Sequence, residues 1–329
     1  TNTLGAAFAP LLAGVILLPV GGAQHALIIF SLAYLLLLPA LNVRNIRWSA
    51  VPVIGAVLLT FLPPLHFVEI PDGGKLIDYR DGVMAAVAVV SDSSETRYLK
   101  VNNHFSMGST SSRFADHRQT HIPLLLHDDP RSVLYLGVGT GMTMNAAQYH
   151  PDLAVTAVEL VPESLDILDY FGTEPQQNTW AIPPRLLASD ARRFVVSSNS
   201  AYDVIIADLF HPSRDGAGSL YTREHFEAIK HRLAPDGVFV QWLPLFQMDL
   251  DTFKIVARTF ADRFPYVQVH VPHFSLHQPI IGLVGSTSQL KFGRNRLINR
   301  VVTTPLQRQL VSLRLNSDLA LYGVLLGDR

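Results

Sequence analysis

Hydrophobic residues follow two different patterns in the two parts of the chain. Residues 1–42 contain no Asp, Glu, Lys or Arg and form two long apolar runs, 4–20 and 23–41. A third apolar run, 51–62, is shorter. A helix needs about 20 predominantly apolar residues to cross a bilayer. We therefore predict a transmembrane helical segment over 1–66, with two to three spans.

Buried helices of a soluble protein and a cleaved signal peptide are the two alternatives for the apolar runs. The buried helices of a soluble protein are also apolar, and a cleaved signal peptide would give one run rather than three. Because the chain begins at Thr1 rather than Met, we expect the set of spans to be incomplete. Two basic residues precede the third run and two follow it. The excess of Lys and Arg that marks cytoplasmic loops is therefore absent, and the orientation in the membrane is not predicted.

From residue 67 the apolar positions occur in short segments with β-strand character. Segments 76–79, 83–90 and 96–101 are separated by turn sequences rich in Gly, Asp and Ser. This pattern predicts a small N-terminal β domain over 67–112, with an antiparallel sheet.

Strand-like and helix-like segments alternate from residue 113 onward. Such alternation is typical of an α/β fold with a mostly parallel sheet and right-handed crossovers. We predict this seven-stranded domain over 113–290, followed by a C-terminal helical tail over 291–329. The predicted strands are 132–136, 154–158, 185–188, 204–207, 237–242, 267–270 and 280–284. The predicted helices are 114–126, 143–148, 162–171, 191–196, 222–232 and 249–264.

Composition narrows the classes of function. The net charge is -1, with 26 basic and 27 acidic residues, so the chain has no basic footprint for nucleic acid. There is no cysteine, which excludes a disulfide framework, a thiolate zinc site and a cysteine nucleophile.

A glycine-rich turn follows the first predicted strand of the α/β domain. Gly137, Gly139 and Gly141, with Thr140 between the last two, lead into a predicted helix. Glycines there allow tight backbone geometry and close approach by a nucleotide. The G-x-G-x-G spacing is shorter than the G-x-G-x-x-G of dinucleotide enzymes and favours a site of the S-adenosylmethionine type. An ordinary glycine turn is the alternative.

Acidic residues follow the next strands of the predicted sheet. Glu159 ends the second strand and is placed to accept hydrogen bonds from ribose hydroxyls. Asp190, followed by Ala191, comes after the third strand and is placed at the adenine edge. Asp208 ends the fourth strand, facing the reacting end of the nucleoside. A helix cap or a salt bridge is the alternative for any one of these acids, and their repetition at successive strand ends favours a site.

Six sequence blocks resemble the ordered motifs of the spermidine synthase (polyamine aminopropyltransferase) family. The blocks are 137–141, 157–160, 189–192, 202–212, 219–226 and 233–242. The resemblance extends from about residue 76 to residue 285, and the apolar runs before it resemble the branch in which such a domain is fused to a membrane, transporter-like segment.

The resemblance implies a methyltransferase-like Rossmann domain preceded by a small β-sheet. It also implies decarboxylated S-adenosylmethionine as the donor co-substrate, a small amine such as putrescine as acceptor, no metal, and a homodimer. Glu159, with Leu160 beside it, would hold the ribose, Asp190 and Ala191 would lie at the adenine, and Asp208 would be the base. His211, close to Asp208 in sequence, could share the proton transfer or cap its loop.

The chain departs from the family pattern at several acids. Thr140 and His211 stand where family members usually have Asp, and Ala115-Asp116-His117 stands where they have Tyr-Gln/His-Glu. Ordinary S-adenosylmethionine therefore stays open as the donor. The two alternatives are a methyltransferase acting on a small acceptor and a non-catalytic nucleoside-binding regulatory domain of a transporter-like membrane protein.

Histidines are numerous around the predicted site: His104, His117, His121, His127 and His211. Imidazoles bind metals, but only His117 and His121 share a helix at an i, i+4 spacing, so we predict structural or site-lining roles. The donor is made in the cytosol, which favours a bacterial-type inner membrane with the catalytic domain on its cytoplasmic side. Three spans that begin inside would place the domain outside.

Overall fold

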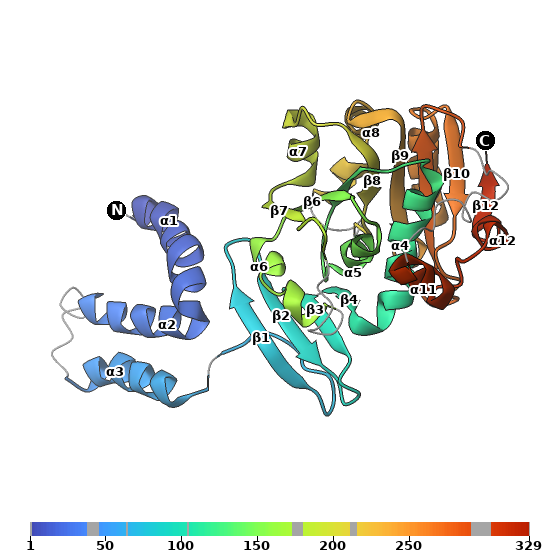
Figure 1. Cartoon of the computed structure of the whole chain (residues 1–329). Coiled ribbons are helices and arrows are strands. Elements are labelled where there is room, and N and C mark those ends of the chain that lie inside the picture. Colours follow the sequence, from blue (N-terminus) through green and yellow to red (C-terminus); the bar gives the residue numbers. More distant parts are fainter. Residues whose placement is uncertain are drawn as a thin grey trace. The chain divides into compact units, whose positions relative to one another are not determined.

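The structure is a computed structural model that describes residues 2–37, 46–63, 65–103, 105–172, 180–210, 216–290 and 304–328. The chain forms two compact units, Thr1–Met107 and Gly108–Arg329. Figure 1 shows the helices and small sheet of the first unit and the large mixed sheet of the second.

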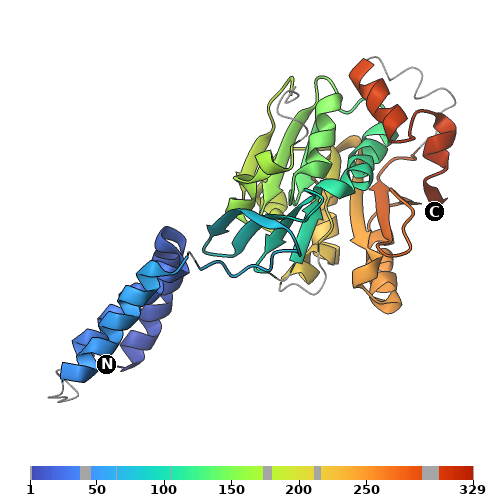
Figure 2. The same ribbon diagram turned by 90° about the horizontal axis from the view of Figure 1, so that it is seen from below.

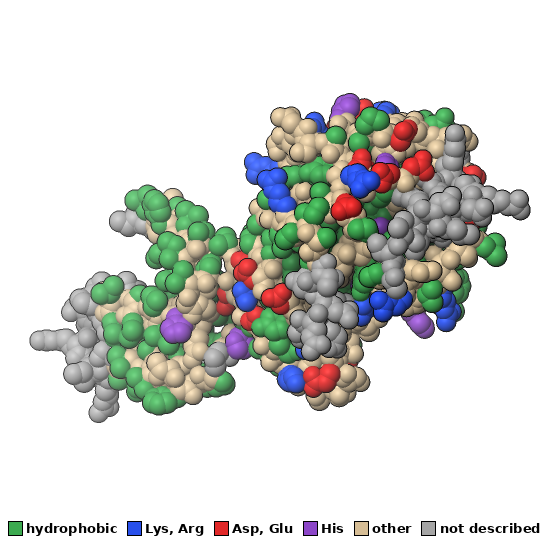
Figure 3. Space-filling view, viewed as in Figure 1, with side chains coloured by type: hydrophobic (Ala, Val, Ile, Leu, Met, Phe, Trp, Pro, Cys, Tyr) green, Lys and Arg blue, Asp and Glu red, His purple; other side chains and the backbone are tan. Residues whose placement is uncertain are grey.

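The first unit begins with helices that leave apolar side chains on the surface. They are α1 (Asn2–Leu11), the π-helix η1 (Leu12–Leu17), α2 (Leu18–Ala33), the 3-10 helix η2 (Tyr34–Leu37) and α3 (Ile46–Phe61). Segment Thr3–Leu36 is long and apolar enough to cross a membrane, and none of its most apolar window is buried; Ala50–Phe61 is shorter. Figure 3 shows this surface as mainly hydrophobic, whereas acidic and basic side chains lie over other parts of the chain.

The backbone breaks its direction at Gly22 within this long segment. Gly22 has φ 72° and ψ 172°, outside the helical region, so two helices meet there. The run before it is about 30 Å long at 1.5 Å per residue. Gln24 lies just beyond the break and donates from its amide to the carbonyls of Leu59 and Leu62 at 2.5 and 3.0 Å. A polar side chain thereby links α2 to the end of α3.

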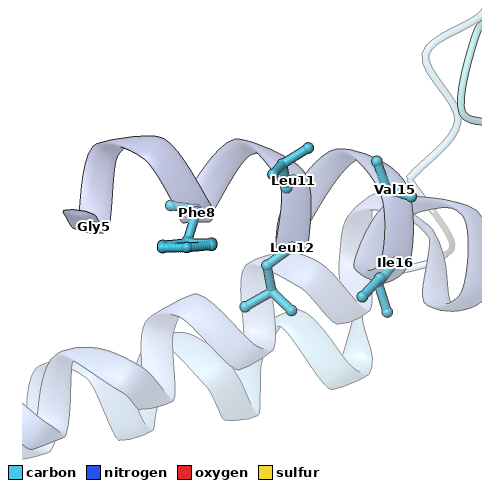
Figure 4. Close-up of a pocket in the computed structure, with 7 residues that line it drawn as sticks. Gly5, Phe8, Leu11, Leu12, Val15 and Ile16 are labelled. Atoms are coloured by element: carbon cyan, nitrogen blue, oxygen red, sulfur yellow. The ribbon is translucent and has the colours of Figure 1, made fainter. Parts of the chain in front are cut away.

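A hollow of about 590 Å³ lies along α1 and η1 (Figure 4). Its lining is apolar throughout: Gly5, Phe8, Ala9, Leu11, Leu12, Val15 and Ile16. It offers no charged or hydrogen-bonding side chain, so it has none of the groups that nucleoside chemistry requires.

The small sheet of the first unit has the strand order β1-β2-β3-β4. Its strands are β1 (Lys75–Asp81), β2 (Ala86–Ser91), β3 (Arg97–Val101) and β4 (Phe105–Ser109). β2 pairs antiparallel with both β1 and β3, and its side chains are almost all buried. The sequence pattern predicted three of these strands and missed β4.

The second unit is built on an eight-stranded sheet with the order β12-β10-β11-β9-β8-β5-β6-β7. β5 pairs parallel with β6 and β8, β6 with β7, and β8 with β9. β11 lies antiparallel to β9, and β10 is antiparallel to both β11 and β12. The strands are β5 (Ser132–Leu136), β6 (Ala154–Glu159), β7 (Arg185–Ala188), β8 (Tyr202–Ala207), β9 (Leu233–Pro244), β10 (Tyr266–His270), β11 (Ile280–Ser286) and β12 (Leu325–Asp328).

Helices lie on both faces of this sheet (Figure 2). Alternate residues of the strands belong to two different buried clusters. Tyr135 belongs to one buried cluster with residues of α4, while its neighbours Leu134 and Leu136 belong to the other, with residues of α8 and α9. A strand buried on both faces is apolar along its length, and the four buried residues of β5 that follow Ser132 are Val, Leu, Tyr and Leu. The helices are α4 (Arg113–Leu126), α5 (Met142–Asn145), η4 (Ala146–Tyr149), α6 (Pro162–Leu165), η5 (Leu168–Tyr170), α7 (Ala191–Ser197), η6 (Ala217–Tyr221), α8 (Arg223–Lys230), η7 (Leu245–Gln247) and α9 (Leu250–Ala261).

The C-terminal tail contains the eighth strand as well as helices. α11 (Thr304–Ser312) and α12 (Asp318–Tyr322) precede β12, which pairs with the edge strand β10. The prediction of a purely helical tail missed this strand because four residues, three of them exposed, carry no readable alternation. The tail is held to α4 by a hydrogen bond from the Arg118 guanidinium to the Leu313 carbonyl at 3.0 Å.

Candidate functional site

The strand order changes direction between β5 and β8, and the predicted site residues gather at this point. From β5 the chain moves outward to β6 and β7, then returns to the opposite side of β5 as β8. In open α/β sheets, ligands bind beyond the carboxyl ends of the strands at such a reversal. The glycine turn after β5 and Asp208 after β8 flank it.

Backbone hydrogen bonds hold the four strand ends level with one another. Gly137 donates to the Val158 carbonyl at 2.9 Å, and Asp208 donates to the Leu136 carbonyl at 2.9 Å. Ser189 donates to the Glu159 carbonyl at 2.8 Å. The ends of β5, β6, β7 and β8 therefore form one continuous edge.

The glycine turn brings the backbone close to Asp208. Gly137 has φ 86°, and a Cβ there would lie 3.2 Å from both the Asp208 Cβ and a ring carbon of Phe210. Gly139 and Gly141 also have positive φ, 53° and 74°. The turn thus passes so close to β8 that a side chain at Gly137 would be strained.

Glu159 is bonded to the glycine turn itself. The residue is 4% exposed, and one carboxylate oxygen accepts hydrogen bonds from the N–H groups of Val138 and Gly139 at 2.9 and 3.1 Å. The other oxygen accepts from the Val161 N–H at 3.0 Å. A carboxylate has about four acceptor positions, so three backbone donors leave one for a further donor such as a ribose hydroxyl. The ribose contact stays a prediction.

The other predicted nucleoside-binding residues have local structural partners. Asp190 is the N-cap of α7 and accepts from the Arg193 N–H at 2.7 Å, which is the capping role considered as its alternative. Ala191 packs against the buried cluster beneath α7, whereas Leu160 is 43% exposed. Thr140 is 5% exposed, and its hydroxyl accepts from the Met142 N–H at 3.4 Å.

Asp208 lies in surroundings that favour its protonated form. The pKa of Asp208 is raised to about 6: burial raises it most, the Leu209 N–H, which donates to the carboxylate at 2.8 Å, lowers it, and the nearby charge of Glu159 raises it. A carboxyl group with a pKa near neutrality can both accept and release a proton under physiological conditions.

Neutral polar groups surround Asp208. The Tyr221 hydroxyl lies 2.9 Å from the Phe210 carbonyl, and the Tyr135 hydroxyl lies 2.9 Å from the Thr120 hydroxyl. Burial, together with the charge of Asp208, raises the pKa of both tyrosines. The Gln241 amide donates to the Asp208 carbonyl at 3.4 Å, and its own oxygen is buried without a partner among the described residues.

The structure places a further acid, Asp116, within electrostatic reach of Asp208. Asp116 lies in the first turn of α4, and its carboxyl group is 2.5 Å from the Ser112 hydroxyl. Burial raises its pKa to about 7, the Ser112 hydrogen bond lowers it, and the charge of Asp208 raises it. The sequence analysis named Asp116 only as part of a motif that departs from the family pattern. Its position could have marked it as a site residue, because a helix that leads into β5 begins at the ligand-binding edge.

The histidines are placed differently. His104 and His211 lie outside the described residues. Gln309 donates to the His117 Nδ1 at 2.6 Å, and the His121 Nδ1 lies 2.9 Å from the His150 Nε2. Burial lowers the pKa of His117 to about 3 and that of His121 well below its ordinary value. These side chains are therefore neutral at pH 7.

The remaining histidine and the other possible ligands give no metal site in the described ranges. His127 Nδ1 accepts from the Asp129 N–H at 3.2 Å. Within the described ranges, no group of three or more His, Cys, Asp or Glu could hold a metal ion.

Known proteins share this architecture. A spermidine synthase solved with the transition-state analogue AdoDATO matches with a TM-score of 0.57 and 17% identity, covering 72% of this chain and 89% of that one. The spermidine synthase of Thermotoga maritima matches with a TM-score of 0.55 and 17% identity, covering 72% and 87%. At these identities the likeness concerns the fold, which is the methyltransferase-like Rossmann fold with a small antiparallel sheet before it.

Sequence comparison gives the family. The spermine/spermidine synthase domain matches residues 114–291, more than half of the chain, and the chain belongs to this family. Polyamine aminopropyltransferase 2 of Hyperthermus butylicus is 29% identical over 170 residues, 51% of this chain and 56% of that protein. Polyamine aminopropyltransferase 2 of Pseudomonas aeruginosa is 34% identical over 158 residues, 46% and 45%. The chain thus spans about half the length of these curated relatives.

Proposed function

We propose that this protein is a membrane-anchored aminopropyltransferase. It transfers an aminopropyl group from decarboxylated S-adenosylmethionine to a small amine such as putrescine. The observation that carries the proposal is the position of Asp208, a half-buried carboxyl group whose pKa is raised to about 6, beside the glycine turn at the strand reversal. The names of the relatives support the same reaction class.

The chemistry requires an amine to lose a proton before it can act as a nucleophile. An alkylamine resembles lysine, with a pKa of about 10.4, and is protonated at neutral pH. Its nitrogen lone pair attacks the carbon bonded to the sulfonium sulfur. The new C–N bond forms as the C–S bond breaks, and the electrons of that bond neutralise the sulfur. The proton of the amine passes to the ionised carboxylate of Asp208.

The residues of the strand edge divide the remaining tasks. Glu159 holds the glycine turn and offers its free acceptor position to the ribose, while Asp190 lies at the end of β7 for the adenine. Thr140 offers no charge to the aminopropyl end of the donor. Other groups must therefore distinguish decarboxylated from ordinary S-adenosylmethionine. His211 lies four residues from the end of β8, and a share in proton transfer is its proposed role.

The N-terminal helices supply the membrane attachment in this proposal. Segment Thr3–Leu36 carries no charged residue, and its side chains are largely exposed, so a bilayer would cover them. The donor is a cytosolic metabolite, which favours a catalytic domain on the cytoplasmic side. A homodimer is the expected assembly.

Calorimetric titration of the detergent-solubilised chain tests the donor. Decarboxylated and ordinary S-adenosylmethionine are titrated separately into the wild type and into Glu159→Ala. We expect preference for the decarboxylated donor in the wild type and weak binding of either in the variant. Mass spectrometry of a reaction with putrescine then tests for an aminopropylated product.

The other outcomes separate the alternatives. Preference for ordinary S-adenosylmethionine, with a methylated acceptor, would replace the proposal by a methyltransferase. Binding without any product would leave a nucleoside-binding regulatory domain, and binding of neither donor would contradict both enzyme assignments.

A further inference from the structure

We infer that Asp116 is the second acceptor-side carboxylate of this protein and binds the distal ammonium group of a diamine, while Asp208 faces the reacting nitrogen. The inference rests on the proposed function and specifies its substrate class: an amine with two cationic nitrogens. Positions 117 and 211 are histidines in this chain and carry no negative charge that could bind an ammonium group. Asp116 would supply that charge instead.

The direction of α4 places Asp116 at the ligand-binding edge. α4 ends at Leu126, and β5 begins at Ser132 after a short connection, so the helix returns along the sheet antiparallel to β5. The first turn of α4 therefore lies at the carboxyl end of β5, where Asp208 and the glycine turn also lie. The electrostatic influence of Asp208 on Asp116 agrees with this placement.

The helical periodicity directs Asp116, and not its neighbour, toward this edge. Residues four apart share a helix face, so Asp116 lies on the face of Thr120. The Thr120 hydroxyl contacts the Tyr135 hydroxyl at 2.9 Å and the Thr143 carbonyl at 2.5 Å, both beside the glycine turn. His117 lies on the face of His121 and bonds to Gln309 in the tail. An acid at 116 therefore reaches a place that an acid at 117 would not.

The Ser112 hydroxyl leaves Asp116 with unused acceptor capacity. It lies 2.7 Å from the Ser109 carbonyl and 2.5 Å from the Asp116 carboxyl group, and it donates toward both oxygens. One hydroxyl hydrogen cannot fully satisfy two acceptors, so the carboxylate can accept further hydrogen bonds from an ammonium group. Because the pKa of Asp116 is raised to about 7, mainly by burial, the group is partly protonated at neutral pH while no amine is bound.

The charges around the pair suit a cation. Asp208 and Glu159 are acidic, Tyr135 and Tyr221 are neutral, and in the part of the chain that the structure describes neither Asp116 nor Asp208 has an ion-pair partner. The Gln241 amide nitrogen donates to the Asp208 backbone carbonyl, and the amide oxygen of this fully buried side chain is an acceptor without a partner among those residues. A cationic amine would supply the missing positive charge and release the proton held by Asp116.

Steady-state kinetics with two matched acceptors tests the inference in the full-length protein. Putrescine and n-butylamine have the same carbon chain and differ only in the second amine. A charged hydrogen bond changes an equilibrium by roughly 10- to 100-fold. We expect the wild type to prefer putrescine in kcat/KM by at least about tenfold. Asp116→Asn should reduce that preference to about twofold or less by raising KM for putrescine, with little change for n-butylamine.

Three controls separate binding from folding. Asp262→Asn changes an exposed acid beyond the end of α9 and should keep the wild-type preference. Asp116→Glu keeps the charge and should retain part of the preference. Calorimetric donor binding of Asp116→Asn should match that of the wild type, and its unfolding temperature at pH 7 should be at least as high, which establishes that the variant is folded.

Each result has a defined meaning. An unchanged preference in a folded Asp116→Asn variant would overturn the inference while leaving aminopropyl transfer intact. Equal loss of activity with both amines would also overturn it, because it would indicate a structural role. Absence of turnover with any amine in the wild type would instead contradict the proposed function.

Discussion

Asp208 and Asp116 both differ from ordinary surface carboxylates, because the pKa of each is raised toward neutrality, to about 6 and about 7. Burial is the first cause in each, and a neighbouring carboxylate adds to it: Glu159 for Asp208, and Asp208 for Asp116. Buried charges without partners are unfavourable, and protonation relieves the cost. The arrangement is reasonable for a site that receives a cation.

The pKa of Asp208 predicts a pH dependence of turnover. The base acts only when ionised, so the ratio of kcat/KM in the wild type to that in Asp208→Asn should rise as pH increases through about 6 and level off above. The ratio cancels the deprotonation of the amine itself, which is common to both proteins. At the plateau we expect a ratio of about 10² to 10⁴. A ratio that is constant from about pH 5 to about pH 8 would contradict the role of base.

The pKa of Asp116 predicts a pH dependence of stability. Its value in the folded protein is about 7, against an ordinary 3.8, so the folded state binds more protons between those values. The free energy of unfolding should therefore fall as pH rises from about 4 to about 7, by at most about 4 kcal/mol for this group. Thermal unfolding of Asp116→Asn should show a smaller fall over the same range. Parallel curves for variant and wild type would contradict the assignment.

At the scale of elements, the site depends on how closely the turn after β5 approaches β8. Gly137 meets the Asp208 side chain and the Phe210 ring across the strand reversal. The N–H groups of Val138 and Gly139 are held by Glu159 at the end of β6. Three strand ends thereby set the shape of one turn, and a change in the turn should disturb all of them.

Gly137→Ala tests this dependence. The added Cβ would lie 3.2 Å from two neighbours in a backbone conformation, φ 86°, that L residues rarely adopt. We expect a loss of about 1–3 kcal/mol in the free energy of unfolding and at least about tenfold weaker donor binding. Gly327→Ala on β12, where nothing lies within 4 Å of an added Cβ, is the matched control and should behave as the wild type. Similar donor affinity in both variants would argue against the close approach.

At the scale of the whole molecule, the N-terminal helices expose an unusually large apolar surface. Leu36 and Val20 are more than four-fifths exposed, and residues 1–42 carry no charge to solvate them. Apolar surface of this extent in water is unfavourable, and a bilayer removes the cost.

Liposome flotation measures the membrane association. We expect the full chain to float with vesicles and to remain bound in high salt, because apolar attachment is not screened by ions. A variant lacking residues 1–66 should stay in the soluble fraction. Release of the full chain by salt would indicate electrostatic attachment and contradict a span.

Three features can be read directly from the amino-acid sequence: the apolar N-terminal segment, the alternating strands of an α/β sheet and the glycine turn at 137–141. These features are local, since they depend on periodicity and on residues close in sequence. The break in the long helix lies at Gly22, between the two apolar runs. The short strands β4 and β12 were missed because their pairing partners, not their own residues, define them.

The acids of the site come together through tertiary packing. Asp116 and Asp208 are separated by about half of the α/β domain in sequence, and they meet because α4 returns along β5 while β8 inserts beside it. The pKa values near neutrality follow from that burial and proximity, and no local pattern encodes either. Conversely, His117 follows Asp116 directly in sequence, yet its place on the helix turns it toward the tail. Charge and contact at the site are therefore consequences of packing, whereas the elements that carry them are readable from the chain.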